Sequence, residues 1–433
     1  MRAALWLMAM FSVAAAAALF AGSNPGTVTV YWYPVRVDLS LNMVLLGLAA
    51  AFLAMHLALR ALAAMFRIPR EARRWRLLQK ERAIQTQLLE SLSHLTGGRF
   101  IRARKAAEAV IALEASVAGS GNALPYADRL RTLSHLLAAE SAHALQDQGV
   151  REQHFQQALE HASARDAQDT RDGLQLRAAK WAFDDRDAPR ALDWLGRLPQ
   201  GAGRRTVALR LRFKVERRAG NTLAALEIAR LLTKHRAFSE AAGASIARGL
   251  ALEWLRSAHD AAQAQRAWAA LEASERQMPD VAIQAAERLL VLGGDGELAR
   301  QWLLPLWDAM AEHMDALTLA QRLRLVRVLE SSFRNSGGAP DAAPDRAWLT
   351  RIESAQMRNP RDPVLQYLAG VVCMQLSLWG KAQQLLKQSL TLLQDPTFKR
   401  DAWKALALMA EQRQDSVAAA DAYRQALQEA SSL

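Results

Sequence analysis

Two long apolar segments near the N-terminus limit what this chain can fold into. Residues 3–22 contain no charged side chain, and residues 39–66 contain one, Arg60, together with the polar Asn42 and His56. A helix rises about 1.5 Å per residue, so about 20 apolar residues match the hydrocarbon core of a bilayer. The sequence therefore predicts a hairpin of two transmembrane helices joined by a short loop. A cleaved signal peptide is the alternative for the first segment.

The charges beside the second segment predict the orientation of this hairpin. Seven basic and two acidic residues lie between Arg67 and Arg82, whereas the loop before the segment holds only Arg36 and Asp38. Segments rich in Lys and Arg stay on the cytoplasmic side of a membrane. We therefore expect residues 1–66 to form a hairpin with both ends in the cytoplasm and a periplasmic loop. This arrangement predicts a multi-pass protein of a bacterial inner membrane, with membrane lipids as a partner.

The remainder of the chain is expected to be helical. Hydrophobic residues make up 51% of the 433 residues, with many Ala and Leu, whereas only 6% are aromatic and there are only 13 Pro and 22 Gly. Such a composition favours helix. Runs with alternating β-branched residues are almost absent, and the one candidate, residues 27–33, is expected to be too short and too isolated to form a sheet. The predicted fold class is therefore all-α.

Helical periodicity occurs in pairs of segments, and the second segment of each pair carries a recurring pattern of small residues. A small residue is followed by a large one four positions later and by a small one three positions after that. This pattern is typical of tetratricopeptide repeats, because small side chains let neighbouring helices approach closely. The predicted packing residues are Ala382, Leu386 and Ser389 in the clearest unit, Ala419, Tyr423 and Ala426 in the last unit, and Trp403, Leu406 and Ala407 in the first helix of that last unit.

Weaker matches to this pattern precede the two clear units and extend the predicted array. The steps between the last four of them are 34, 39 and 35 residues, close to one repeat each. A break rich in Gly and Pro at residues 334–344 divides the array into a basic juxtamembrane helix with a front array, residues 67–333, and C-terminal repeats, residues 345–433. A tetratricopeptide-like α-solenoid of this kind presents an extended protein-binding surface. The weaker matches begin at Ala103, Ala191, Ala225, Ala264 and Ala299.

The chain carries no motif for catalysis or for a cofactor. Its single cysteine, Cys373, excludes an intramolecular disulfide and a thiolate metal cluster, and we expect it to be buried. The nine histidines lack the spacing of helical zinc sites, and His154 and His161 are expected on the solvated surface. Phosphate-binding and dinucleotide-binding fingerprints are also lacking. We therefore predict that the protein is not an enzyme and holds no cofactor and no metal.

One helical segment is strongly basic in a chain whose net charge is +12. Residues 204–218 contain seven basic residues against Glu216 alone. Such a helix could contact phosphates or anionic lipid headgroups. Because no exposed aromatic residues alternate with the charges, we interpret it as a solvated helix face or a protein contact. No nucleic-acid partner is predicted.

The N-terminal region of the chain resembles the HemY family. The resemblance covers residues 1 to about 130, and the remaining repeats match only in architecture. The features that carry it are an apolar helix after Arg2, the segment at residues 33–42, a second apolar helix followed by Ile68 and Pro69, the group Arg73, Arg74 and Trp75, and then Gly98, Arg99, Phe100, Ala103 and Lys105.

This resemblance implies an inner-membrane protein with a cytoplasmic repeat domain that acts in late protohaem IX biosynthesis. It implies a non-enzymatic scaffold or assembly factor whose partners are late haem-pathway enzymes. A haem- or porphyrin-binding carrier, and an envelope-assembly adaptor unrelated to haem, are the alternatives. The family supplies no catalytic residue. The candidates for family-specific contacts are Arg36, Asp38, Arg73, Arg74 and Trp75, although capping of the second helix and membrane topology would also explain them.

Overall fold

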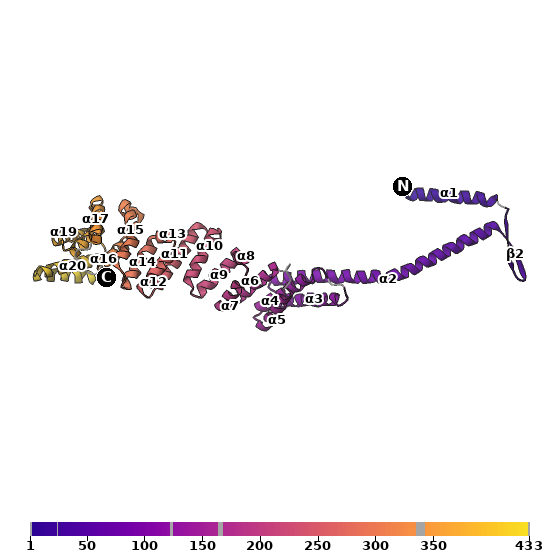
Figure 1. Cartoon of the computed structure of the whole chain (residues 1–433), viewed down its shortest axis with the longest axis horizontal. Helices are drawn as coiled ribbons and strands as arrows, with labels where there is room; N and C mark the ends of the chain where they lie inside the picture. The colour runs from indigo at the N-terminus through magenta and orange to yellow at the C-terminus, as the bar shows by residue number, and fades with distance from the viewer. Residues whose placement is uncertain (1, 24, 122–123, 163–167, 335–342, 432–433) are drawn as a thin grey trace. The chain divides into compact units, whose positions relative to one another are not determined.

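The computed structural model describes residues 2–23, 25–121, 124–162, 168–334 and 343–431, which are mostly helical (Figure 1). The helical composition predicted from the sequence is therefore confirmed. The chain divides into two compact units, unit 1 (Met1–Leu174) and unit 2 (Gln175–Leu433), and each is described by itself. The domain boundaries expected from the sequence stay predictions.

The longest helix, α2 (Leu41–Thr96), joins an apolar segment to the repeats of unit 1. Its stretch Leu41–Ala63 has a mean hydropathy of 2.0 and is the one described segment long and apolar enough to cross a membrane. The C-terminal part of the same helix packs against α3 (Phe100–Ala118), with Ile84 buried at the contact. The preceding helix, α1 (Arg2–Gly22), contributes only a shorter apolar stretch, so the predicted two-helix hairpin is not confirmed.

Residues 27–40 form a β-hairpin, which corrects the expectation that they form no sheet. Strand β1 (Thr27–Trp32) pairs antiparallel with β2 (Val35–Ser40). Val30 lies opposite Val37, and such β-branched pairs stabilise neighbouring strands. The prediction was wrong because it considered the first strand alone, whereas its partner follows after only two residues, Tyr33 and Pro34.

Unit 1 contains a second helical pair that the sequence analysis missed. Helices α4 (Ala127–Ala144) and α5 (Gln148–His161) pack against each other, and α4 also packs against α3. Phe155 and Ala158 of α5 are buried at the positions of the repeat pattern. The pattern was not found because Arg151 occupies the position where the other units have alanine.

The helices of unit 2 also follow in pairs, beginning with the last turns of α6 (Gln168–Asp184). Successive pairs stack, and the first helices of neighbouring pairs contact each other from α11 onward. The remaining elements are α7 (Ala188–Gly196), α8 (Gln200–Gly203), α9 (Thr206–Arg218), α10 (Thr222–Lys234), α11 (Glu240–Arg256), α12 (Ala261–Ala270), α13 (Ala273–Arg276), α14 (Pro279–Val291), α15 (Gly296–Glu312), the 3₁₀ turn η2 (Met314–Ala316), α16 (Leu319–Arg334), α17 (Ala343–Arg358), α18 (Pro363–Gln375), α19 (Trp379–Leu392), α20 (Pro396–Gln412) and α21 (Ser416–Ala430).

One type of turn closes seven of the pairs. A residue in the left-handed region follows the first helix, and the next backbone N–H donates to the carbonyl five residues earlier. This turn sets where the second helix begins and therefore which of its residues face the first helix. The left-handed residues are Gly98, Gln146, Arg186, Gly220, Gly293, Ser377 and Gln414, and the donors after them are Arg99, Asp147, Asp187, Asn221, Gly294, Leu378 and Asp415.

The predicted packing residues lie between the helices. The small residue that begins each predicted pattern is at most 5% exposed. Such burial agrees with the close helix approach that small side chains allow. Leu386, Ser389, Leu406, Ala407 and Ala426 are also buried, and Trp403 and Tyr423 are half-buried.

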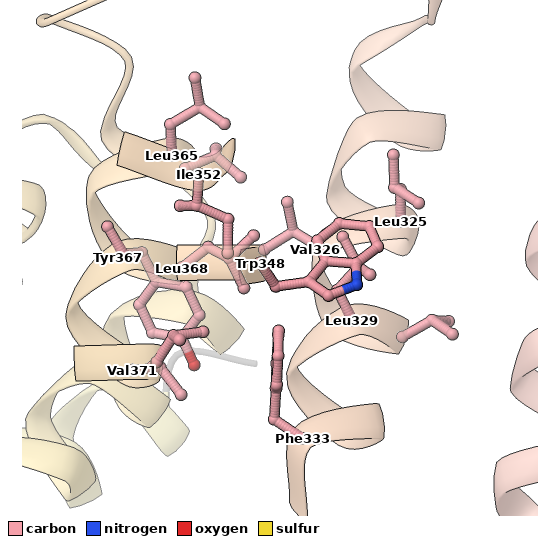
Figure 2. Close-up of a cluster of buried hydrophobic side chains, with 14 of the residues drawn as sticks. Leu325, Val326, Leu329, Phe333, Trp348, Ile352, Leu365, Tyr367, Leu368 and Val371 are labelled. Carbon is pink, nitrogen blue, oxygen red and sulfur yellow. The ribbon is translucent and has the colours of Figure 1, made fainter. Parts of the chain in front are cut away.

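The apolar core of unit 2 continues across the break expected at residues 334–344. Figure 2 shows Trp348 of α17 beside Phe333 of α16, and their ring centres lie 6.5 Å apart in an edge-to-face arrangement. Trp348 also meets the ring of Trp307 on α15 at 5.9 Å. Part of the expected break, residues 335–342, lies outside the described residues, but the helices on either side of it share one core.

Candidate functional site

The candidate contact residues from the family resemblance lie in separate places of unit 1. Arg36 and Asp38 are exposed neighbours on β2, with Nε and Oδ1 3.3 Å apart. Trp75 is 60% exposed on α2, and about 50 Å of helix separates it from the hairpin at 1.5 Å per residue. Arg73 and Arg74 belong to the same helix, but their side chains lie outside the described residues. The structure does not bring these residues together into one site.

Three histidines come together between α4 and α5, which corrects the expectation that His154 and His161 lie on the solvated surface. The Nδ1 atoms of His135 and His154 lie 3.0 Å apart. The rings of His135 and His161 stack with centres 5.8 Å apart. Spacing along one helix could not reveal this cluster, because His135 comes from the preceding helix.

Burial affects the protonation of His135 and His154. Burial, together with the nearby charges of His154, His161 and Arg131, lowers the pKa of His135 to about 4. Burial also lowers the pKa of His154, although Glu108 opposes the shift. His135 is therefore neutral near pH 7. In the part of the chain that the structure describes, no group of three or more His, Cys, Asp or Glu side chains is arranged to hold a metal ion.

A buried ion pair lies beside the histidines. Arg131 donates from Nε and Nη2 to the two carboxylate oxygens of Glu114, at 2.5 and 2.9 Å. Glu114 is 1% exposed, whereas the Arg131 side chain is 28% exposed, so the pair links α3 to α4 at the edge of the core. Arg151, which stands at the usual alanine position, contacts His143 Nδ1 at 2.9 Å. Unit 1 therefore has a polar layer between its helices.

Cys373 is fully buried in α18, as expected from the sequence. Burial raises the pKa of its thiol to about 11, so the thiol stays protonated near neutrality. Nearby, the Tyr367 hydroxyl donates to Glu330 Oε2 at 2.9 Å and joins α18 to α16. Burial raises the pKa of Glu330. All three groups are buried, and Tyr367 and Glu330 contact each other within the core.

Two hollows open between first helices of unit 2, and both are lined by cations. One, of about 590 Å³, lies between α14 and α16, and its charged side chains are Arg324, Arg327, Arg334 and Glu287. The other, of about 460 Å³, lies between α6 and α9. It is lined by Leu176, Arg177, Lys180, Phe183 and Asp184 of α6 and by Val207, Arg210, Leu211 and Lys214 of α9. The basic segment predicted at residues 204–218 thus forms one wall of a hollow.

Solved structures with similar helical arrangements include a TPR domain. The Cut9–Hcn1 hetero-tetramer of the APC/C has 15% identity and a TM-score of 0.27, over 79% of this chain and 66% of that chain. The TPR domain of P58(IPK) has 13% identity and a TM-score of 0.22, over 76% of this chain and 99% of that chain. This chain thus spans slightly less than two thirds of the first relative. Scores this low carry no argument about function.

A comparison of the sequence with known families is more specific. No curated protein matches the chain. The family model described as "HemY protein N-terminus" matches residues 26–146, which hold the β-hairpin, α2, α3 and α4. The matched region overlaps the segment on which the resemblance was based. Residues 26–146 are therefore similar to the N-terminal region of HemY proteins.

Proposed function

We propose that this protein is a non-enzymatic, membrane-anchored scaffold of late protohaem IX biosynthesis. In this proposal, its repeat domain gathers enzymes of the pathway through protein–protein contacts. The haem role rests on the HemY N-terminal match, and the scaffold role rests on the stacked helical pairs. Both extend beyond what the family match alone establishes.

The observation that carries the proposal is the continuity of α2. The apolar stretch Leu41–Ala63 and the first helix of the repeats are parts of one helix, without a loop between them. At 1.5 Å per residue, the apolar stretch is about 35 Å long, which is sufficient for the hydrocarbon core of a bilayer. A helix that leaves the membrane and directly enters the repeat core would hold unit 1 at the membrane surface.

The side of the membrane follows from the charges next to this stretch. Seven basic residues and two acidic residues follow it between Arg67 and Arg82. Under the positive-inside rule, this excess keeps the helix end and the repeats in the cytoplasm. We propose a two-helix hairpin in the inner membrane, with residues 3–22 as the first span and the β-hairpin on the periplasmic side.

Porphyrin profiling of a deletion strain tests the haem role. If the protein supports late haem synthesis, deletion should cause porphyrin intermediates to accumulate, and the full-length chain should restore the normal profile. An unchanged profile would contradict the haem role and favour an envelope-assembly adaptor. Purified protein that shows a Soret shift on titration with haem would instead favour a haem carrier.

Affinity purification from solubilised membranes tests the scaffold role. Full-length protein should recover late haem-pathway enzymes in amounts that exceed those recovered by a chain lacking unit 2. Equal recovery by the two chains would place the contacts in unit 1, and recovery of no pathway enzyme would contradict the scaffold role.

A further inference from the structure

We infer that the hollow between α6 and α9 binds an acidic segment of a partner protein, with an apolar side chain of that segment inserted into the hollow. The inference rests on the proposed scaffold function and specifies the chemistry of the partner. It joins two features, the apolar lining of the hollow and the cations around it.

The hollow offers an apolar surface enclosed by positive charge. Leu176 and Phe183 line it from α6, and Val207 and Leu211 line it from α9. Val207 is 64% exposed, so the apolar surface is accessible from solvent. A recess of about 460 Å³ has the dimensions of a small ligand pocket and can accept a large apolar side chain.

The cations stand on both walls of the hollow. Arg177 and Lys180 are three residues apart on α6, and Arg210 and Lys214 are four residues apart on α9. Residues at these spacings share a helix face. The only acidic side chain in the lining is Asp184. An approaching carboxylate would therefore meet positive charge from both helices.

Three of these cations have no carboxylate to neutralise them. Within the described ranges, no ion pair of 4.0 Å or less involves Lys180, Arg210 or Lys214, and all three are exposed. The hollow between α14 and α16 differs in this respect. There Arg324 pairs with Glu287 at 3.0 Å, and Arg334 pairs with Glu330 at 3.0 Å. Arg327, the third arginine there, has no carboxylate partner within the described residues but donates to Thr397 Oγ1. Of these two hollows, the one between α6 and α9 therefore has more positive charge available for a partner.

Contacts to backbone carbonyls hold part of the basic wall in position. Arg210 donates from Nη2 to the carbonyl oxygen of Ala237 at 3.0 Å, which leaves its other N–H groups available. Arg218 donates to the carbonyl oxygen of Phe183 at 3.2 Å, and its guanidinium lies 5.1 Å from the centre of the Phe183 ring. Side chains that are already ordered lose less entropy when a partner binds.

An acidic protein segment fits this hollow better than an anionic bilayer or a nucleic acid does. Phosphate groups would satisfy the cations, but they would leave the apolar side chains of the recess in contact with water. A peptide with carboxylates around a large apolar residue satisfies both features at once. Charge complementarity and the apolar recess together therefore identify the class of partner.

Binding of a labelled peptide to the purified full-length protein tests this inference. The probe is a synthetic helical peptide with Glu on one face and Leu on the other, and the control peptides replace Glu by Gln or Leu by Ala. The double variant Lys180→Glu/Lys214→Glu should weaken binding about tenfold or more, because it reverses one charge on each wall of the hollow. Val207→Ser, a milder variant of the apolar rim, should weaken binding about threefold.

Arg324→Glu in the other hollow is the matched charge control and should change the affinity by less than about twofold. The inference would be overturned if Arg324→Glu weakened peptide binding as much as the double variant does. It would also be overturned if the double variant bound the peptide as tightly as the unchanged protein. It would also be overturned if the Leu-to-Ala peptide bound equally well, or if phosphatidylglycerol vesicles displaced the probe from the hollow. Thermal unfolding checks that each variant is folded.

Porphyrin profiling separates this inference from the proposed haem role. Peptide binding at the hollow together with a normal porphyrin profile in the deletion strain would contradict the haem role alone. An altered profile together with absence of peptide binding would contradict only the acidic-partner inference.

Discussion

Unit 1 and unit 2 are built from the same helical pairs but differ in what lies between the helices. In unit 1, the Arg131–Glu114 ion pair and the histidine cluster lie among small apolar clusters. Unit 2 also holds buried polar pairs, Arg230 with Glu275 and Tyr367 with Glu330, but they lie beside a larger apolar core. One apolar cluster there extends from Ala258 to Ala422 and includes the aromatic group around Trp348 (Figure 2). Apolar burial depends little on pH, whereas charged and titratable groups respond to it directly. The two units should therefore respond differently to mutation and to acid.

The largest expected effect is the loss of an aromatic residue from the core of unit 2. Trp307 is 1% exposed and meets Trp348 edge to face. Trp307→Ala should lower the free energy of unfolding of unit 2 by about 3–5 kcal/mol, because it removes buried apolar surface and leaves a cavity. Amide hydrogen exchange, followed separately in the two units, measures the change. The exposed Trp75→Ala is the control and should cost less than about 0.5 kcal/mol.

Breaking the Arg131–Glu114 ion pair should have the next largest effect on stability, and this effect should occur in unit 1. Glu114→Ala leaves the Arg131 guanidinium without its carboxylate partner. We expect unit 1 to lose about 2–3 kcal/mol, since the variant removes a bidentate pair and leaves the half-buried guanidinium without a partner. Denaturant unfolding compares this variant with Asp128→Ala, whose carboxylate is 66% exposed and lies 3.8 Å from Arg131. Equal losses for the two variants would show that burial of the pair does not matter.

Acid should destabilise unit 1 through the histidine cluster. The pKa of His135 is about 4 in the folded chain, against 6.5 for an unperturbed histidine. Between these values the unfolded chain binds more protons, so the free energy of unfolding falls as the pH drops from 6.5 to 4. For His135 the loss reaches about 2–3 kcal/mol. Unfolding measured across this range should show a weaker pH dependence for His135→Gln, whereas the exposed His259→Gln in unit 2 should leave the dependence unchanged.

The smallest predicted effect concerns the turns that both units share. Gln414 has a φ of 61°, in the left-handed region that favours glycine. Gln414→Gly should therefore stabilise the last pair by about 0.5–1 kcal/mol. Gly220→Ala, at a φ of 76°, should destabilise its pair by about 1 kcal/mol. Thermal unfolding of the two variants measures whether each change in stability has the expected direction. If Gln414→Gly were less stable than the unchanged protein, the glutamine side chain would have a role beyond the turn.

Some features of the fold followed from local sequence patterns. The alanine pattern located Ala382 and Ala419 because close helix approach requires a small side chain at a set distance from the turn. The glycine turns at Gly98 and Gly220 also carried a clear signal. Four turns of the same type gave no such signal, because a residue other than glycine adopts the left-handed conformation there. A backbone hydrogen bond holds that conformation, and it does not depend on the residue type. The four residues are Gln146, Arg186, Ser377 and Gln414.

Other features depend on contacts between residues that are distant along the chain. His135 and His154 are 19 residues apart and meet only after α4 packs on α5. The hollow between α6 and α9 needs side chains from two helices that are separated by a third and by a short turn. In the same way, the β-hairpin needed both of its strands to be considered together.

The sequence by itself determined the helical composition, the apolar stretch in α2, the repeat pattern and the HemY resemblance, because each is encoded by residues close together in the chain. Only the tertiary structure decided which charges are neutralised. Arg131, Arg324 and Lys214 are all basic residues in helices. Arg131 pairs with a buried carboxylate, Arg324 pairs with an exposed one, and Lys214 has no acidic partner among the residues that the structure describes. Those differences depend on the side chains that neighbouring helices bring within reach, and local sequence does not contain them.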